Sequence, residues 1–208
     1  MRLALPKGKL LPPLVSLFES SGIILEFKID RDYRPHTDYP NLDIKLFKAR
    51  SIPQLVALGN FDIGFCGHDV FIETKYEEVV EILSTNFNKV EIVVATLRGK
   101  ENIIVTPPKR PILIATEYEN IADNWAARNN LSHITLQSRG STEAYPPEDA
   151  DIIIDCVETG QTLEANNLVI IERLFETATV LIANKFSLKD EEKKQEIKMF
   201  VDKISKKL

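Results

Sequence analysis

The sequence predicts an α/β fold with mostly parallel strands, arranged in two lobes. Strand-like and helix-like segments alternate almost throughout the 208 residues, which is typical of α/β layers. Two long apolar segments, 90–96 and 180–183, join a first strand–helix series to a second one. We therefore expect a lobe I of residues 1–92 plus 178–208, a lobe II of residues 93–177, and a ligand site in the cleft between them.

In the first series, each expected element follows from spacing or alternation. Leu10, Leu14 and Leu17 recur at helical spacing, and apolar residues alternate with charged ones over 42–46, as in a half-buried strand. The expected elements are a strand over 2–5, a helix from 10 to 21, a strand over 42–46, a short helix over 51–58 and a strand over 61–65.

The second series repeats the alternation after the long strand 90–96 and a polar loop over 98–110. Its expected elements are strands over 112–115, 134–137 and 152–154, with helices over 120–128 and 163–166. The strand 180–183 and a charged, amphipathic helix over 189–207 follow.

Composition excludes several classes of protein. Hydrophobic residues make up 44% of the chain and charged residues 27%, an ordinary globular balance, and the net charge of −5 disfavours a nucleic-acid partner. Cys66 and Cys156 lie far apart and the histidines are scattered, so no disulfide or metal site is indicated. With neither a signal peptide nor an apolar run long enough for a membrane span, we expect a cytoplasmic protein without a membrane partner.

The segment 151–163 carries the clearest chemistry. A buried strand leads to Asp155, and a loop with Thr159, Gly160 and Thr162 precedes a helix. Glycine lets the loop curl so that successive amides point inward, which suits a phosphate, while the carboxylate can accept hydrogen bonds from sugar hydroxyls. The alternative is a plain strand, a Thr-Gly turn and a helix capped by Thr162.

The order of residues in this segment resembles the phosphoribosyl pyrophosphate loop of ATP phosphoribosyltransferases. Type I phosphoribosyltransferases place two adjacent acids before their loop, whereas Cys156 follows Asp155 here. Six further stretches resemble that family in the same order, over residues 1 to about 185: 5–10 (family LPKGRL), 49–53 (RA-x-DIP), 62–69 (DLGITG-x-D), 114–121 (VATKYPNI), 140–143 (GSVE) and 181–184 (LIAN).

The resemblance implies a two-lobed periplasmic-binding-protein-like (type II) fold with the active site in the inter-lobe cleft. It implies attack of adenine N1 of ATP on C1′ of phosphoribosyl pyrophosphate, with loss of pyrophosphate and with Mg²⁺, in the first step of histidine biosynthesis. Cations must then meet the leaving group as C1′ becomes oxocarbenium-like. The alternative function is a two-lobed solute-binding or effector-sensing module without catalysis.

The resemblance also assigns residues to the site. The expected catalytic residues are Asp155, Lys7, Lys48 and Arg50. The expected phosphoribosyl pyrophosphate-binding residues are Asp155, Glu158, Thr159, Gly160, Gln161, Thr162 and Leu163. The expected ATP-binding residues are Lys9, Arg31 (with Arg34 as an alternative), Gly67, Thr116, Tyr118, Ser141 and Glu143.

Some positions depart from the family pattern. Lys48 stands where an arginine is common, so the charge is kept without the planar fork, unless Arg50 substitutes. Ser51 replaces a usual Asp, and Glu117 replaces a usual Lys. Only one charged helix follows the 181–184 stretch, a pattern that resembles short catalytic subunits; a truncated long form is the alternative. The short form implies a homo-oligomer and a hetero-oligomer with a regulatory subunit resembling histidyl-tRNA synthetase.

Overall fold

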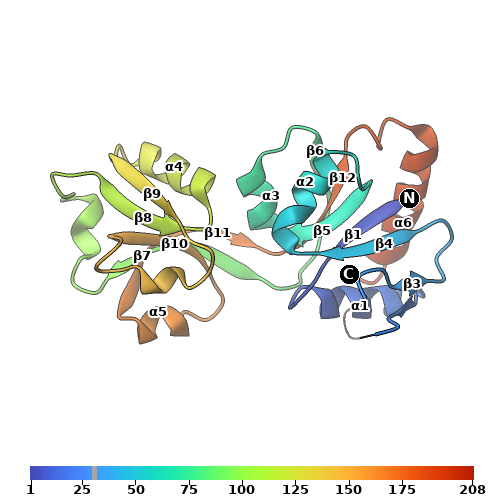
Figure 1. Cartoon of the computed structure of the whole chain (residues 1–208), viewed down its shortest axis with the longest axis horizontal. Helices are drawn as coiled ribbons and strands as arrows, with labels where there is room; N and C mark the ends of the chain where they lie inside the picture. Colours follow the sequence, from blue (N-terminus) through green and yellow to red (C-terminus); the bar gives the residue numbers. More distant parts are fainter. Residues whose placement is uncertain (30–31) are drawn as a thin grey trace. The chain divides into compact units, whose positions relative to one another are not determined.

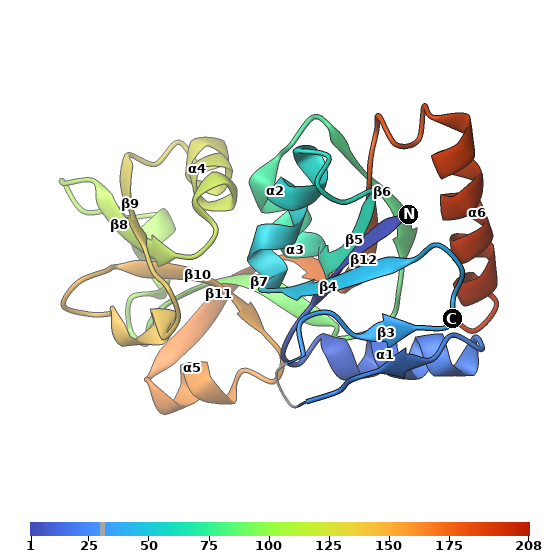
Figure 2. The ribbon, with the colours of Figure 1, turned by 45° about the vertical axis from the view of Figure 1, so that its right-hand side comes forward.

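The computed structural model describes residues 1–29 and 32–208 and divides the chain into two compact units (Figure 1). Unit 1 comprises Met1–Asn88 and Ala178–Leu208, and unit 2 comprises Lys89–Thr177. Each unit has its own five-stranded sheet with helices packed on it (Figure 2). The chain thus leaves unit 1 after residue 88, slightly before the expected boundary at residue 92, and returns at residue 178.

Unit 1 is built on a mixed sheet with the strand order β4-β1-β5-β12-β6. Strand β1 pairs in parallel with β4 and β5, while β12 is antiparallel to β5 and β6. Its strands are β1 (Arg2–Pro6), β4 (Asp43–Phe47), β5 (Ile63–Gly67), β6 (Val79–Ser84) and β12 (Thr179–Asn184), with a small hairpin of β2 (Leu25–Glu26) and β3 (His36–Thr37). Its helices are α1 (Leu11–Ser20), α2 (Ile52–Ala57), α3 (His68–Thr74) and α6 (Glu191–Ser205), with a 3₁₀ turn η1 (Ala49–Ser51).

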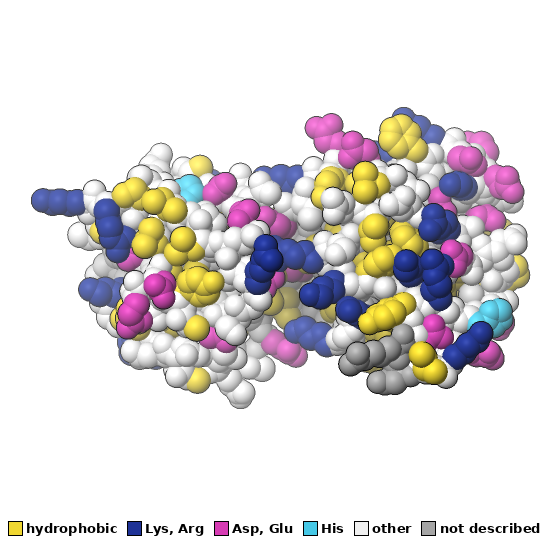
Figure 3. Space-filling view, in the orientation of Figure 1, with side chains coloured by type: hydrophobic (Ala, Val, Ile, Leu, Met, Phe, Trp, Pro, Cys, Tyr) yellow, Lys and Arg dark blue, Asp and Glu magenta, His cyan; other side chains and the backbone are white. Residues whose placement is uncertain are grey.

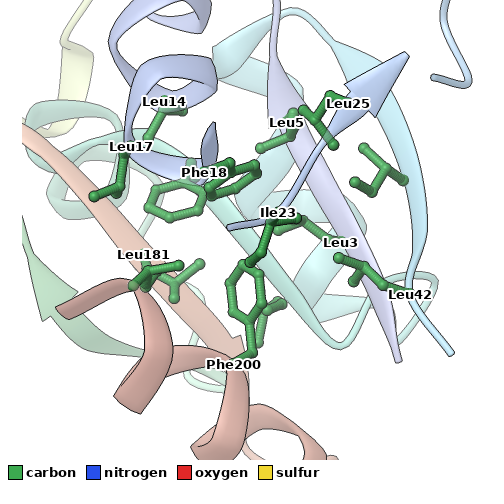
Figure 4. Close-up of a cluster of buried hydrophobic side chains, with 14 of the residues drawn as sticks. Leu3, Leu5, Leu14, Leu17, Phe18, Ile23, Leu25, Leu42, Leu181 and Phe200 are labelled. Atoms are coloured by element: carbon green, nitrogen blue, oxygen red, sulfur yellow. The ribbon is translucent and has the colours of Figure 1, made fainter. Parts of the chain in front are cut away.

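The strands of unit 1 bury both faces, because successive side chains point to opposite sides. Leu3 and Leu5 pack with α1 and α6, whereas Ala4 packs on the other face with α2. Figure 4 shows the first of these clusters, in which Phe18 of α1 meets Phe200 of α6 edge to face, with 5.6 Å between ring centroids. The expected amphipathic last helix therefore packs on its own unit.

A buried carboxylate joins α6 to the sheet of unit 1. Asp62 is 4% exposed and accepts hydrogen bonds from the Arg2 amide at 2.7 Å, the Ser187 hydroxyl at 2.7 Å and Lys193 Nζ at 2.8 Å. Burial raises the pKa of Asp62, but these donors outweigh burial and hold the pKa below its usual value. Asp62 is a structural residue of this unit.

Unit 2 has the strand order β11-β7-β10-β8-β9. Strands β10, β8 and β9 run parallel to one another, and β7 is antiparallel to both β10 and β11. Its strands are β7 (Val90–Leu97), β8 (Ile112–Thr116), β9 (His133–Gln137), β10 (Ile152–Val157) and β11 (Leu168–Thr177). Its helices are α4 (Glu119–Arg128) and α5 (Gln161–Ala165), with 3₁₀ turns η2 (Glu101–Ile104) and η3 (Thr142–Ala144).

Helices α4 and α5 cover opposite faces of this sheet (Figure 1). Leu163 of α5 packs with Val93 and Ile153. Trp125 of α4 is fully buried, and its indole Nε1 donates to Glu172 Oε2 at 2.7 Å. Trp125 is therefore a core residue, as its place in a helix predicts.

Several sequence-based expectations need correction. The loop 98–110 contains the turn η2, and strand β10 continues through Asp155 to Val157, so Asp155 does not end its strand. Strand β12, expected to join the lobes, lies inside the sheet of unit 1 between β5 and β6. The strands β2, β3, β6 and β11 and the helix α3 were not predicted. Among the described residues, no helix combines the length and the apolar character needed to cross a bilayer.

Candidate active site

Parallel pairing gathers the polar segments of unit 2 at one edge of its sheet. Ile154 of β10 is level with Thr116 of β8, which is level with Gln137 of β9. The carboxyl ends of the three strands therefore meet, and ligands of α/β sheets bind beyond such ends. These strand ends and the segments that follow them contain the expected site residues of this unit, namely Thr116, Tyr118, Ser141, Glu143, Asp155 and residues 158–163.

Asp155 is half-buried at this edge. Its Oδ1 accepts a hydrogen bond from the Cys156 amide at 2.7 Å, and Thr142 hydrogen-bonds to the carboxylate as well. Burial raises the pKa of Asp155 above its usual value, the two hydrogen bonds lower it, and the nearby charges of Glu143 and Glu117 raise it. The local field is therefore negative and stabilises a positive charge placed against it.

The turn after β10 is largely exposed. Gly160 has a φ of 79° and precedes α5 without any side-chain cap. The Thr159 hydroxyl lies 3.5 Å from the Gln161 amide, a weak contact, so both groups can bind elsewhere. Thr162 does not cap the helix, contrary to the plain structural alternative.

The expected residues of this edge divide into exposed and buried ones. The side chains of Glu158, Thr159, Gln161 and Thr162 are exposed. By contrast, Leu163 is 6% exposed and belongs to the core, so any contact it makes with a ligand is through its backbone.

Thr116 and Tyr118 hold the edge together. The Thr116 hydroxyl donates to the Ile154 carbonyl at 2.6 Å and accepts from the Tyr118 amide at 2.8 Å. Thr116 is fully buried and Tyr118 is 6% exposed. This geometry makes both residues part of the scaffold, and their contact with ATP stays a prediction.

Two neighbours of Asp155 were missed by sequence reasoning. Ser138, directly after β9, and Thr142, in η3, are each 1% exposed, and their hydroxyl oxygens are 2.8 Å apart. Both lie in a polar segment, 138–143, that resembles a solvent-exposed loop, so the sequence carried no signal of their burial. A cavity of about 280 Å³ lies beside the turn and is lined by Arg98, Thr159 and Gly160, among others. Arg98 is therefore a further basic residue near this turn.

In unit 1, parallel pairing likewise gathers basic residues at one edge. Strands β1, β4 and β5 run in the same direction, so the residues after Pro6, Phe47 and Gly67 share that edge. The exposed cations there are Lys7, Lys9, Lys48 and Arg50. The Lys7 amide donates to the Phe47 carbonyl at 2.8 Å, which ties the first turn to the end of β4.

A largely apolar pocket of about 610 Å³ adjoins this edge. It is lined by Lys7, Gly8, Leu11, Phe27, Ile29 and Tyr33, among others. Lys7 Nζ lies 5.3 Å from the centroid of the Tyr33 ring, a cation–π distance. Figure 3 shows basic and hydrophobic side chains interspersed on the visible face of unit 1.

The remaining expected ATP contacts of unit 1 have mixed outcomes. Arg31 lies outside the described residues. Arg34 pairs with Asp43 at 3.8 Å, at the start of β4 and so at the opposite end of that strand from Lys48. A Cβ on Gly67 would lie 2.2 Å from Asp69 Oδ1, so this glycine makes room for the Asp69 carboxylate.

Comparison with known proteins decides the family. The family model described as HisG, ATP phosphoribosyltransferase, matches residues 48–206. The chain belongs to the ATP phosphoribosyltransferase family. A relative from Prosthecochloris aestuarii with that name is 36% identical over 95% of this chain and 68% of its own length. An ATP phosphoribosyltransferase from Alkaliphilus metalliredigens is 35% identical over 100% of this chain and 97% of its own.

Solved structures agree with the family in fold. The ATP phosphoribosyl transferase (HisG:HisZ) complex from Thermotoga maritima contains a chain with a TM-score of 0.84 and 25% identity, covering 99% of this chain and 97% of that one. The alkanesulfonate-binding protein SsuA from Xanthomonas axonopodis pv. citri matches with a TM-score of 0.52 and 9% identity, over 99% of this chain and 72% of that one. The two-lobed, periplasmic-binding-protein-like α/β fold is thus confirmed for this ATP phosphoribosyltransferase.

Proposed function

We propose that the edge of unit 2 around Asp155 holds the phosphoribosyl group in the reaction of this family. The enzyme is an ATP phosphoribosyltransferase, which joins ATP to phosphoribosyl pyrophosphate in the first step of histidine biosynthesis. One observation carries the residue assignment: a half-buried carboxylate stands beside an exposed turn whose glycine is left-handed. The membership in this family disfavours the alternative of a solute-binding module without catalysis.

In this proposal the turn binds the 5′-phosphate and Asp155 binds the sugar. The amides around Gly160 and the hydroxyls of Thr159 and Thr162 supply donors for phosphate oxygens. The carboxylate accepts hydrogen bonds from the ribose 2′- and 3′-hydroxyls. Its negative surroundings stabilise the positive charge that develops at C1′ as the bond to pyrophosphate lengthens.

The leaving pyrophosphate needs cations, and we assign this task to basic residues. Lys7, Lys48 and Arg50 are exposed at the carboxyl edge of the sheet of unit 1. Among the described residues, no group of three or more His, Cys, Asp or Glu side chains is arranged to hold a metal ion. We therefore propose that Mg²⁺ enters with the phosphates of the substrates and neutralises part of their charge.

We also propose that this chain works in an assembly in the cytoplasm. The Thermotoga maritima structure is a complex of HisG with HisZ. By analogy, the proposed state of this chain is a homo-oligomer joined to a regulatory subunit that resembles histidyl-tRNA synthetase. Sedimentation of the chain with and without such a subunit tests this state.

The residue assignment is tested by turnover. Purified chain is mixed with ATP, Mg²⁺ and phosphoribosyl pyrophosphate, with and without a regulatory subunit, and N1-substituted adenine and pyrophosphate are followed. Asp155→Ala and Thr159→Ala should each lower turnover at least ~10²-fold. Asp149→Ala, which removes an exposed carboxylate ahead of β10, is the matched control and should leave turnover unchanged. Turnover at the wild-type rate in both test variants would remove Asp155 and Thr159 from the site.

A further inference from the structure

A chain of buried hydroxyl groups lies behind Asp155. Ser138 and Thr142 are each 1% exposed, their hydroxyl oxygens are 2.8 Å apart, and Thr142 in turn hydrogen-bonds to Asp155. Buried hydroxyls need hydrogen-bond partners, and here Ser138 has Thr142 while Thr142 has both Ser138 and Asp155. The geometry therefore links Asp155 to the ends of β9 and η3.

The direction of these hydrogen bonds follows from the chemistry of the groups. An ionised carboxylate has no proton to donate, so the Thr142 hydroxyl must donate to Asp155. The Thr142 hydroxyl has one proton, which it gives to Asp155. In the hydrogen bond of 2.8 Å between Ser138 and Thr142, Ser138 must therefore be the donor. Charge-assisted bonds of this kind are stronger than those between neutral groups.

The backbone beneath the hydroxyl chain is itself fixed. The Ser138 amide donates to the Thr116 carbonyl at 2.9 Å, and the Thr116 hydroxyl donates to the Ile154 carbonyl at 2.6 Å. Ser138 is thereby tied to the ends of β8 and β10. A Ser138 hydroxyl held in this way can fix Thr142 and, through Thr142, the orientation of the Asp155 carboxylate.

We propose that Thr142 and Ser138 are positioning residues, which hold the Asp155 carboxylate in one rotamer and keep it ionised for the sugar hydroxyls. The inference rests on the proposed contact between Asp155 and the ribose. In this proposal Thr142 and Ser138 do not contact the substrate. They affect the reaction through the orientation and ionisation of Asp155.

The charges around Asp155 make its ionisation sensitive to these donors. Glu143 faces it from η3 and Glu117 from the segment after β8, and both raise the pKa of Asp155, as burial does. On the β7 side its partner is the apolar Val93. The donors opposing protonation are the Cys156 amide and Thr142. Loss of the Thr142 hydroxyl should therefore raise the pKa of Asp155 further.

The test uses Thr142→Val, Thr142→Ser and Ser138→Ala in the full chain with its regulatory subunit. Valine keeps the shape of threonine, and the family stretch GSVE has valine at this position. Thr142→Val should lower kcat/KM for phosphoribosyl pyrophosphate by about 10- to 100-fold, the factor expected for a hydrogen bond to a charged group. It should also move the acid limb of the pH profile to higher pH, while Thr142→Ser keeps both near wild type.

Ser138→Ala should act in the same direction with a smaller effect, because Ser138 touches Asp155 only through Thr142. The matched control is Thr96→Val, which removes a fully buried hydroxyl of the same sheet that donates to the Asp151 carbonyl at 2.8 Å. This control should leave the acid limb in place. A shift of the limb in the control as well would mark the effect as general destabilisation and overturn the inference.

A second measurement separates this inference from the proposed function. The carboxyl carbon of Asp155 is titrated by NMR in the free protein, wild type and variants. A higher pKa in Thr142→Val and in Ser138→Ala supports the hydroxyl chain, and an unchanged pKa in both overturns it. If Asp155→Ala turns over like wild type, the sugar contact fails, and the NMR titration still decides the hydrogen bonds. If Thr142→Val does not fold, Ser138→Ala and Thr142→Ser decide the outcome.

Discussion

The buried carboxylate of Asp62 should contribute about 3 kcal/mol to the stability of unit 1. Asp62→Ala leaves the Arg2 amide and the Ser187 hydroxyl, each 2.7 Å from the carboxylate, without their acceptor. A hydrogen bond to a charged group contributes about 1.5 kcal/mol or more, so the two bonds give about 3 kcal/mol. The side chain of Lys193 is 46% exposed, and its ion pair adds little.

The assay is urea unfolding followed by far-UV circular dichroism. With a slope of about 2 kcal/mol/M, a loss of about 3 kcal/mol moves the midpoint of Asp62→Ala down by about 1.5 M. Lys193→Met is the control, and it should cost less than about 1 kcal/mol because solvent screens its partner charge. A midpoint for Asp62→Ala within about 0.3 M of wild type would refute the reasoning.

The same contribution should depend on pH. The pKa of Asp62 is lower in the folded protein than its usual value, so the ionised form is favoured by folding. The stabilisation is then complete above the unfolded pKa of about 4 and is lost as the pH falls through the folded value. Wild type and Asp62→Asn should therefore converge in stability below about pH 4, and a constant difference down to acid pH would contradict this account.

Three further substitutions have outcomes set by geometry. Gly67→Ala places a Cβ 2.2 Å from Asp69 Oδ1, and we expect a loss of about 1–3 kcal/mol in urea unfolding; an unaltered midpoint would show that the carboxylate moves freely. Gly160→Ala meets no atom closer than 3.9 Å, so its cost is the strain of a φ of 79°, about 1–2 kcal/mol, with a raised KM for phosphoribosyl pyrophosphate; an unchanged KM would argue against a phosphate at this turn. Glu172→Ala removes the acceptor of the Trp125 indole, which should lower the free energy of unfolding by about 1–3 kcal/mol. It should also change the fluorescence emission of this single tryptophan, and identical emission would show that the hydrogen bond does not determine the emission.

Regular alternation made most strands and helices predictable, and irregular segments account for those that were missed. The register of β11 shifts between Ile170 and Glu172 and again between Arg173 and Phe175. Two such irregularities break the two-residue period, so the sequence does not resemble one long strand. Helix α3 begins directly at the end of β5 without a connecting loop and spans only 7 residues, too few for a clear helical period.

The candidate site was predictable where local chemistry defines it. Asp155 and Gly160 belong to one short segment whose residue order is informative by itself. Thr142 and Ser138 have no such local signature, because their importance comes from burial beneath three strand ends that only the folded sheet brings together. Thr116 was chosen by its matching sequence position, and the folded sheet engages its hydroxyl with the Ile154 carbonyl, so its contact with ATP stays a prediction.

The split of unit 1 across the sequence sets the order in which the chain can fold as it is synthesised. Strand β6 pairs only with β12 in its sheet, and β12 begins at residue 179, after all of unit 2 has been made. The C-terminal part also supplies α6, which completes one face of the core. Unit 2 can therefore reach its native state on the ribosome first. Strand β6 has no partner strand in its sheet until the segment that contains β12 emerges.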